Sequence, residues 1–465
     1  MSLDTSELIP TLGAHLREWL PSQAWFDARL NEIDELTVVR TEALRRSWPI
    51  VLWVPVEVVI DAAPSLVHMF VALAASVPAS VPDRGVIGEV PTGGTPLMAY
   101  DALLDPVAAR AVVERLSDTM TDEVPTRIFE RPWVTNIELG SRFDLTLYRR
   151  VQLGKHPDVD LAGALAAAGL SVTCPPAAVW RRGDTDLANL RRRSKRGDLG
   201  VSIAQASARE LLRRRCQPRE NPLDVMDSFA LLGRNLADMH VELAEQYGVT
   251  VGDGEALLDV LVERLPRQLS DEAADVLEHS LSRLVYADDL GGFIRVHNNL
   301  DLSNVERIRS GWLVHRFGCR AQSDLELESR PLSPLVDLAG LLHGCSTVAR
   351  SAAADALAAI NPDEQPEPGT PAALELEADR REVRVLADAW EERAADALIA
   401  GYTSNDAVHR LLPVERIARD ALLTLFELEL SIRDLVVSTL RGHQLVSLPL
   451  ESVDGLIDTP IRLRW

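Results

Sequence analysis

Lysine is almost absent from the sequence: Lys155 and Lys195 are the only two among 48 basic residues. Few positions can therefore supply a lysine that a reaction requires. The sequence also contains no GxxxxGK[ST] phosphate-binding loop, no HExxH zinc motif and no GxSxG hydrolase motif. The one Gly-Lys pair, Gly154-Lys155, is followed by His156, where a phosphate-binding loop needs Ser or Thr. These absences argue against P-loop nucleotide hydrolysis, zincin proteolysis and α/β-hydrolase chemistry.

Cysteines are few, and acidic residues outnumber basic ones. The four cysteines show no CxxC spacing and the histidines are scattered, so the sequence predicts no disulfide framework and no zinc site. The first residues, MSLDTSELIP, lack the basic and apolar regions of a secretory signal, so we expect a cytoplasmic protein. The net charge of −22 argues against nucleic acid or an anionic membrane as the partner. We interpret the basic run at residues 180–197 as a solvated loop, with phosphate binding as the alternative.

No apolar stretch is long and uninterrupted enough to suggest a membrane span. The most apolar one, residues 49–77, is broken by Glu57, Asp61, Pro64 and His68. Its many β-branched residues favour two or three buried strands over a transmembrane helix.

The apolar pattern divides the chain into three parts, and a length of 465 residues allows two or three domains. The expected parts are residues 1–97, of mixed helix and strand; residues 98–205, also mixed; and residues 206–465, mostly helical. In the second part Asp105-Pro106 is a typical helix start, and in the third the helical periodicity of residues 224–248 ends at a glycine. The sequence thus predicts an α+β protein with a helical C-terminal lobe.

Nine segments, in this order, resemble the maltokinase family of the aminoglycoside-phosphotransferase group, within the protein-kinase-like superfamily. They are WLPSQAWF (19–26), YDALLDP (100–106), LTLYRRVQLGKHPDVDL (145–161), LGRNLADMH (232–240), HNNLDLSNV (297–305), WLVHRFG (312–318), LSPLVDLAGLL (332–342), AWEERAADALIAGY (389–402) and LPLESVDGL (448–456). The resemblance implies a two-lobe kinase-like fold with an amino-terminal α/β cap, a smaller mixed lobe and a helical lobe. Active members of the family phosphorylate maltose with ATP and work beside trehalose synthase.

The residues that phosphotransfer needs in this family are replaced. Where the family has HGDLHLGQV, this chain has HNNLDLSNV, so His297 is kept, the catalytic Asp position holds Asn299, and the second His position holds Asp301. A neutral amide cannot act as a base at neutral pH. Where the family has DFEG, the metal-binding Asp position holds Arg316 and the second acidic position holds Gly318. A guanidinium stays protonated and repels a divalent cation.

The nucleotide-binding pair is altered as well. The resemblance places the ATP-binding Lys at Thr146, whose hydroxyl is short and uncharged, and the Glu that pairs with it at Asp160. We interpret Lys155 as a surface residue. Asn304 alone keeps the identity of a metal ligand, and we interpret it as structural. We therefore expect no bound ATP, Mg²⁺ or other metal.

Two functions remain open. The first is a pseudokinase in trehalose, maltose and glycogen metabolism: a binding or regulatory subunit that contacts trehalose synthase or an active maltokinase, or holds a sugar. Arg316 would then fill the metal position and pair with Asp160 or Asp301, unless it points to solvent. The second is an active ATP-dependent sugar kinase, a maltokinase or an amino-sugar kinase, that binds ATP and Mg²⁺ and uses Asp301 as a displaced base. In both cases we expect His297 and Asp337 to be structural.

Overall fold

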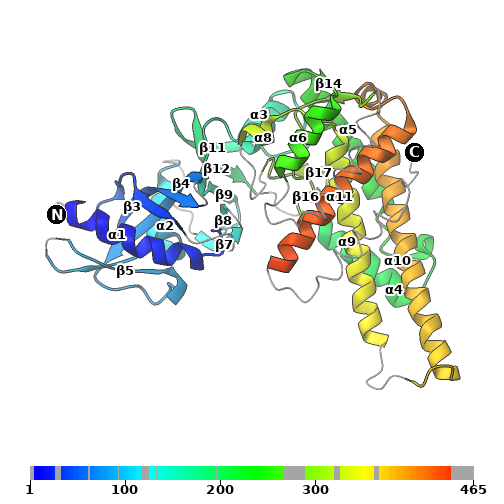
Figure 1. Ribbon diagram of the computed structural model, residues 1–465, viewed down its shortest axis with the longest axis horizontal. Helices are drawn as coiled ribbons and strands as arrows, with labels where there is room; N and C mark the ends of the chain where they lie inside the picture. Colours follow the sequence, from blue (N-terminus) through cyan, green and yellow to red (C-terminus); the bar gives the residue numbers. More distant parts are fainter. Residues whose placement is uncertain are drawn as a thin grey trace. The chain divides into compact units, whose positions relative to one another are not determined.

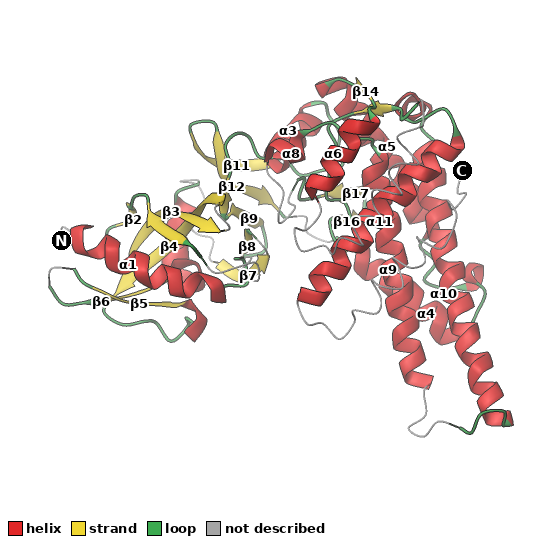
Figure 2. Ribbon diagram, viewed as in Figure 1, coloured by secondary structure: helices red, strands yellow, loops and turns green. Residues whose placement is uncertain are grey.

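The chain divides into two compact units, residues 1–160 with 175–195 and residues 161–174 with 196–465. The computed structural model describes residues 5–26, 33–60, 63–92, 94–116, 125–131, 133–193, 197–264, 289–318, 325–360 and 366–440. Strands are concentrated in the first unit and helices in the second (Figures 1 and 2). This is the mixed N-terminal half and helical C-terminal lobe that the apolar pattern predicts.

The first unit opens with a helix and a seven-stranded antiparallel sheet. The strand order is β1-β3-β4-β6-β5, with β2 added to β3 and β10 added to β4. The elements are α1 (Thr5–Trp19), η1 (Leu20–Ser22), β1 (Glu35–Val38), β2 (Glu42–Arg45), β3 (Ile50–Ile60), β4 (Ala63–Ala74), η3 (Asp83–Gly85), β5 (Val86–Val90), β6 (Leu97–Asp101), η4 (Ala102–Leu104), α2 (Pro106–Glu114) and β10 (Arg150–Val151). Asp105 accepts a hydrogen bond from Val107 N at 3.0 Å, so the predicted helix start at Asp105-Pro106 is confirmed.

The long apolar run forms the two paired strands β3 and β4, and both faces of β3 are buried. Leu52 and Val54 join a cluster with Leu12 of α1, whereas Val51 and Trp53 join a second cluster on the other face. Burial on both faces explains why the run lacks a polar alternation. Among the described residues, no helix combines the length and the apolar composition that a membrane crossing requires.

A second, five-stranded antiparallel sheet completes the first unit, with the order β11-β12-β9-β8-β7. Its strands are β7 (Pro125–Arg131), β8 (Val134–Leu139), β9 (Phe143–Tyr148), β11 (Pro176–Arg182) and β12 (Thr185–Arg192). One face of this sheet packs into the cluster that contains Trp53, through Ile137, Leu145 and Leu190. The other face is polar.

The second unit is built from long helices with two small sheets, β13-β16-β17 and β14-β15. Helix α3 (Pro157–Ala167) passes from the first unit into the second. The other elements are β13 (Asp198–Leu199), α4 (Gly200–Arg214), η6 (Pro218–Glu220), α5 (Met226–Tyr247), β14 (Thr250–Val251), α6 (Gly254–Arg264), β15 (Gly292–Phe293), β16 (Val305–Ile308), β17 (Gly311–Val314), α8 (Leu325–Ser329), α9 (Leu335–Ile360), α10 (Pro371–Thr403), η7 (Asp406–Leu411) and α11 (Arg416–Leu440).

Glycines set two close approaches in this unit. A Cβ on Gly233 of α5 would lie 2.1 Å from the Leu398 oxygen of α10, so only glycine allows these helices to pack so closely. A Cβ on Gly340 of α9 would lie 1.9 Å from the Leu300 oxygen, so this glycine seats the loop that contains Leu300 against α9. The LPLESVDGL segment, residues 448–456, lies outside the described residues.

Candidate functional site: a polar loop with an arginine at the metal position

The polar loop, residues 297–304, connects β15 to β16 and is fixed to the first turn of α9 by one carboxylate. Asp337 accepts hydrogen bonds from His297 N at 2.7 Å, from Asn298 N at 2.8 Å and from His240 Nε2 at 3.0 Å. Asn298 has a φ of +66°, a left-handed conformation that Asn tolerates better than most residues. The carboxylate is 1% exposed, so the start of the loop is held by a buried and fully engaged anion.

A histidine and a tyrosine support this carboxylate from neighbouring helices. His240 of α5 uses Nε2 for Asp337, and its Nδ1 accepts from the Tyr402 hydroxyl of α10 at 2.9 Å. Burial alone would raise the pKa of Asp337, but the His240 hydrogen bond and the contacts of His297 outweigh it and lower that pKa. Burial, and secondarily the Asp337 charge, raises the pKa of Tyr402 well above its usual value, so its hydroxyl stays protonated.

His297 is fully used in holding the loop together. Its Nε2 donates to His315 O at 2.8 Å, and its Nδ1 accepts from Asn299 N at 3.2 Å. Its carbonyl accepts from Gly318 N at 2.9 Å, and its ring lies against Phe317 with centroids 4.5 Å apart. The ring therefore ties the polar loop to residues 315–318 and has no nitrogen left for a substrate.

The other polar side chains of the loop cap its turn. Asp301 Oδ1 accepts from Ser303 N at 2.5 Å and from Asn304 N at 3.1 Å. The Asn304 amide donates through Nδ2 to the Asn299 carbonyl at 2.5 Å. Asp301 thus stabilises the turn, and this structural role alone explains why an aspartate is present there.

Arg316 reaches back to the same turn. Its Nη1 donates to Asn304 Oδ1 at 3.1 Å, and the side chain is partly buried. In the described part of the chain Arg316 forms no ion pair with Asp301, so the prediction of that pair is wrong. The alternative that the side chain only points to solvent is wrong as well, because it contacts Asn304. The Oδ1 atom of Asp160 lies 3.8 Å from Lys155 Nζ, which makes an ion pair. Arg316 has a φ of +68°, which Asp, Asn and Gly adopt far more readily than Arg.

These residues do not fit a magnesium ion. Mg²⁺ is usually bound through one or two carboxylates and oxygen ligands in octahedral geometry. Positions 299, 316 and 318 provide an amide, a guanidinium and no side chain, and the Asn304 oxygen is already taken by Arg316. Within the described ranges no group of three or more His, Cys, Asp and Glu side chains is arranged to hold a metal.

In the first unit, Thr146 lies on the polar face of the five-stranded sheet. It is opposite Asn136 of β8 and Asn189 of β12. Two residues beyond Asn189, on the same face, Arg191 points to the first turn of α3, where its Nη2 lies 3.0 Å from Asp158 Oδ1. A cation on a strand therefore contacts an acidic residue of α3 here, but the pair consists of Arg191 and Asp158, whereas the resemblance assigns the nucleotide-binding positions to Thr146 and Asp160.

This ion pair is buried and is supported by further hydrogen bonds. The Arg191 and Asp158 side chains are 9% and 2% exposed, and Arg191 also donates to the Asp158 carbonyl. Asp158 Oδ2 accepts from Asn189 Nδ2 at 3.1 Å and from the Tyr148 hydroxyl at 3.3 Å. The Tyr148 ring stacks on His156 at 3.7 Å, and burial lowers the pKa of His156 to about 4. Arg191 thus holds the first turn of α3 against the five-stranded sheet.

Sequence reasoning missed Arg191, Asp158, His240 and Tyr402. Two signals were available: Asp158 is a second acidic residue in the first turn of the same helix, two residues before Asp160, and His240 interrupts the apolar face of a strongly periodic helix. Lys155, with its side chain 64% exposed, lies at the surface.

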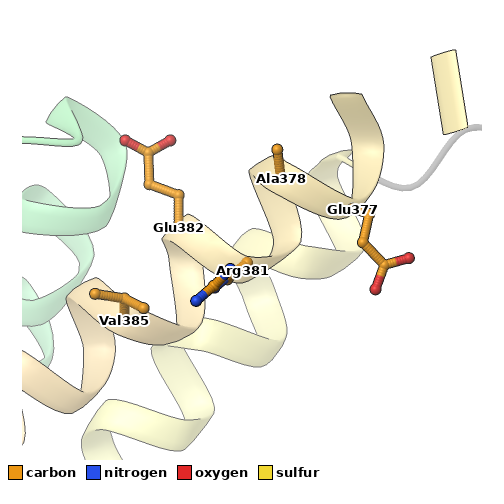
Figure 3. Close-up of a pocket in the computed structure, with 5 residues that line it drawn as sticks. All are labelled: Glu377, Ala378, Arg381, Glu382 and Val385. Atoms are coloured by element: carbon orange, nitrogen blue, oxygen red, sulfur yellow. The ribbon is translucent and has the colours of Figure 1, made fainter. Parts of the chain in front are cut away.

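A hollow is also present on the surface of α10, away from the polar loop in the sequence. It has a volume of about 460 Å³ and is lined by Glu377, Ala378, Arg381, Glu382 and Val385, all from one helix (Figure 3). Its side chains splay outward around the helix, so it lacks the converging polar groups of a substrate site.

Comparisons with known proteins agree with this architecture. Residues 19–105 match the maltokinase N-terminal cap domain family. A glucosamine kinase in complex with glucosamine, ADP and inorganic phosphate is similar over 95% of this chain and 98% of its own, at 14% identity and a TM-score of 0.54. Crystal form A of glucosamine kinase is similar over 98% of this chain and 97% of its own, at 17% identity and a TM-score of 0.58.

At such identities the structural likeness establishes the fold alone. Residues 19–105, which match the maltokinase N-terminal cap domain, lie in the strand-rich first unit and precede the helical second unit. The chain therefore carries a cap of maltokinase type and has, over nearly its whole length, the kinase-like fold of the glucosamine kinases.

Proposed function

We propose that the protein is a pseudokinase: a binding or regulatory subunit of the maltokinase type that does not transfer phosphate. The observation that carries this proposal is the contact between Arg316 Nη1 and Asn304 Oδ1 at 3.1 Å. It fixes a permanent positive charge at the position where the family binds its metal. At ~4 Å and an effective dielectric near 20, such a charge costs a divalent cation about 8 kcal/mol.

The backbone supports the same conclusion. A φ of +68° at Arg316 costs an arginine roughly 1–3 kcal/mol and suits the aspartate that the family has there. The loop thus keeps a conformation suited to a metal ligand while its side chain can no longer be one. A fold retained in this way, with Asp337 and His297 fully engaged, supports a role for the surface or for a pocket instead of catalysis.

A phosphotransfer assay tests the proposal directly. Purified protein is incubated with Mg·ATP and either maltose or glucosamine, and sugar phosphate is followed by ³¹P NMR. We expect none above the background hydrolysis of ATP. Turnover near or above about 1 s⁻¹, the ordinary range for kinases, would overturn the proposal.

The second candidate is an active sugar or amino-sugar kinase with Asp301 as the base. Two observations favour it: the similar solved structures are glucosamine kinases, and Asp301 Oδ2, unlike Oδ1, has no partner among the described residues. The assay separates the two candidates when Asp301→Asn is run beside the parent protein. Activity that this variant abolishes would establish the second candidate, because an amide still accepts the Ser303 and Asn304 hydrogen bonds but cannot take a proton.

The first partner to test is trehalose synthase, followed by an active maltokinase, because active family members work beside the former. A stable complex would bury roughly 1,200–2,000 Å² and survive about 0.5 M NaCl, where exposed charge contacts are screened. Two arginines of the basic run are already paired within the protein, Arg191 with Asp158 and Arg193 with Glu138, so their charges contribute less to a partner surface. Co-purification from the native host at that salt, followed by mass spectrometry, is the test. If neither enzyme is recovered, a solitary sugar-binding protein becomes the better account.

A further inference from the structure

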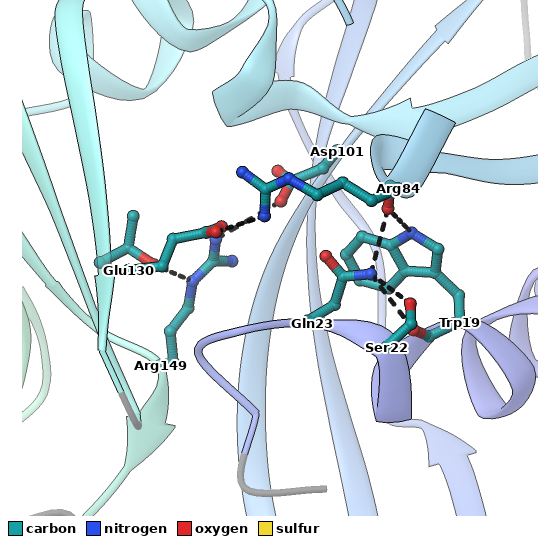
Figure 4. A network of polar contacts seen from close by, with 8 residues as sticks. Trp19, Ser22, Gln23, Arg84, Asp101, Glu130 and Arg149 are labelled. Atoms are coloured by element: carbon teal, nitrogen blue, oxygen red, sulfur yellow. Dashed lines mark hydrogen bonds and ion pairs between the residues drawn. The ribbon is translucent and has the colours of Figure 1, made fainter. Parts of the chain in front are cut away.

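Three of the segments that resemble the family meet at one buried place in the first unit, and the proposed function uses none of them. WLPSQAWF supplies Gln23 and Trp25, YDALLDP supplies Asp101, and the end of the β9 segment supplies Arg149. In Figure 4 the side chains of Gln23, Asp101 and Arg149 point toward one another, together with those of Arg84 and Glu130. We call this place the cap centre.

The orientation of Gln23 is fixed by its neighbours. Its Nε2 donates to the Trp19 carbonyl at 3.2 Å and to the Arg84 carbonyl at 3.1 Å. Two carbonyl acceptors require the amide nitrogen on that side, so Oε1 must be the atom on the other side. Trp19 Nε1 donates to the same Arg84 carbonyl at 2.8 Å and is therefore satisfied within the protein.

Arg149 lies on the side of the centre opposite Gln23 (Figure 4). Its Nε donates to Thr135 Oγ1 at 2.9 Å, and its guanidinium lies over the Trp25 ring at 4.3 Å. Its Nη2 is 3.6 Å from Asp101 Oδ2, which is an ion pair but too long for a hydrogen bond. A water beside this pair, rather than between the two atoms, can accept from Nη2 and donate to Oδ2.

Five polar atoms at the cap centre have no hydrogen-bond partner among the described residues: Gln23 Oε1, Trp25 Nε1, Asp101 Oδ2 and both Nη atoms of Arg149. Their residues are at most 3% exposed, so bulk water does not reach them. Buried polar groups left dry are costly and rare. Burial lowers the pKa of Arg149 and raises that of Asp101, because a site shielded from solvent disfavours the charged form of each group.

The chemistry of these atoms defines what would satisfy them. Trp25 and Arg149 present donors, and Gln23 and Asp101 present acceptors. The charges also balance, because Arg84 pairs with Glu130 at 2.5 Å and Arg149 faces Asp101. A cation or an anion would upset this balance, whereas a neutral hydroxyl group or water, which both donates and accepts, suits this mixture of donors and acceptors.

We propose that the cap centre binds a small hydroxyl-bearing guest, either water or a polyol, that accepts from Arg149 and Trp25 and donates to Gln23 and Asp101. The guest bridges η1, the end of β6 and the residue that follows β9. It thereby connects the three family-like segments through hydrogen bonds. This assignment is independent of whether the protein phosphorylates a sugar.

The indole protons of Trp25 and Trp19 provide a matched test within one molecule. In a deuterated protein labelled with ¹⁵N at the indoles, Trp25→Phe and Trp19→Phe each remove one of nine tryptophan signals and so assign it. All further measurements use the parent chain. In plain buffer we expect a nuclear Overhauser contact between water and the Trp25 indole proton, with the sign of a long-lived water, and none for Trp19.

The measurement is then repeated with excess glycerol. A contact from the glycerol C–H protons to the Trp25 indole proton would identify a polyol as the guest, whereas an unchanged water contact would identify water. Either result supports the proposal. A Trp25 indole proton without contact to water or glycerol, like that of Trp19, would mean a dry centre and would overturn it.

Discussion

Asp337 and Arg316 act on the same polar loop and differ in nearly every respect. Asp337 is buried and accepts three hydrogen bonds, two of them from the loop backbone. Arg316 is partly exposed, and among the described residues it makes one hydrogen bond, to Asn304; its backbone has a conformation that is unfavourable for arginine. One side of the loop is therefore firmly bound to the fold, while the side that contains Arg316 makes few contacts among the described residues. The proposed loss of phosphotransfer concerns this second side only, so the two sides can be tested separately.

The largest effect should come from removing the supporting side. Asp337→Ala leaves two backbone N–H groups and His240 without an acceptor in a buried site, so we expect a loss of about 4–5 kcal/mol in the stability of the second unit. Differential scanning calorimetry should show this as a strongly lowered transition. Glu377→Ala on the exposed face of α10 is the control and should change stability by less than about 0.5 kcal/mol. A loss below about 1 kcal/mol for Asp337→Ala would mean that the loop is held by other contacts.

A buried ion pair in the first unit should rank next. Arg191→Met leaves the Asp158 carboxylate buried and unpaired, although Asn189 and Tyr148 still donate to it, so we expect a loss of about 3 kcal/mol. Arg193→Met is the matched control on the same strand end. The Arg193 pair with Glu138 is more exposed, and its loss should cost about 1 kcal/mol or less. Equal effects in urea denaturation would show that burial does not distinguish the two pairs.

The sequence predicts the fold better than the site, for a physical reason. Strands buried on both faces, the Asp105-Pro106 start and the periodic helix at residues 224–248 are local patterns, and each of these elements is present. The pair of Arg191 and Asp158 joins residues 33 positions apart, and the contact of Arg316 with Asn304 depends on how a hairpin turns back. Segment-by-segment resemblance assigns roles by position, so it does not reveal contacts such as these, which form only when distant segments come together.

The first unit should also lose stability in mild acid. Burial lowers the pKa of His156 to about 4 and that of His68 to about 3, from 6.5. Below pH 6.5 the unfolded chain binds these protons and the folded chain does not, so stability is complete above that pH and falls as pH decreases toward 4. Each histidine should contribute about 1.4 kcal/mol per pH unit within this window.

His156→Asn separates this effect from that of the carboxylates. The variant has one titrating histidine fewer, so its stability should fall less steeply between pH 6 and 4.5 by about 1.4 kcal/mol per pH unit. The comparison is made by urea titration of both proteins at each pH. Identical slopes would mean that the His156 ring is protonated in the folded protein in spite of its burial and its contact with Asp158 N.

The other side of the loop should hardly affect stability. Arg316→Ala removes one partly exposed hydrogen bond and does not relieve the left-handed backbone, so we expect a loss of about 1 kcal/mol or less. Arg316→Gly removes the same bond but relieves the backbone, so it should be more stable than Arg316→Ala by a few tenths of a kcal/mol to about 1 kcal/mol. Calorimetry of both variants measures the difference. If alanine is the more stable of the two, the backbone at this position is not strained.

The smallest effect, none at all, is expected from Mg·ATP on the melting temperature of the parent protein. A ligand stabilises the folded state by RT ln(1 + [L]/Kd), about 2.7 kcal/mol at a hundredfold excess over Kd, so a surviving site would be easy to detect. Arg316→Asp alone should also show no shift, because Thr146, Asn299 and Gly318 still lack the needed groups. The combined variant Thr146→Lys, Asn299→Asp, Arg316→Asp and Gly318→Glu restores all four charges, and it should gain a shift that disappears with EDTA. A saturable shift in the parent protein at submillimolar Mg·ATP would mean that the protein has a nucleotide site, and the pseudokinase proposal would fail.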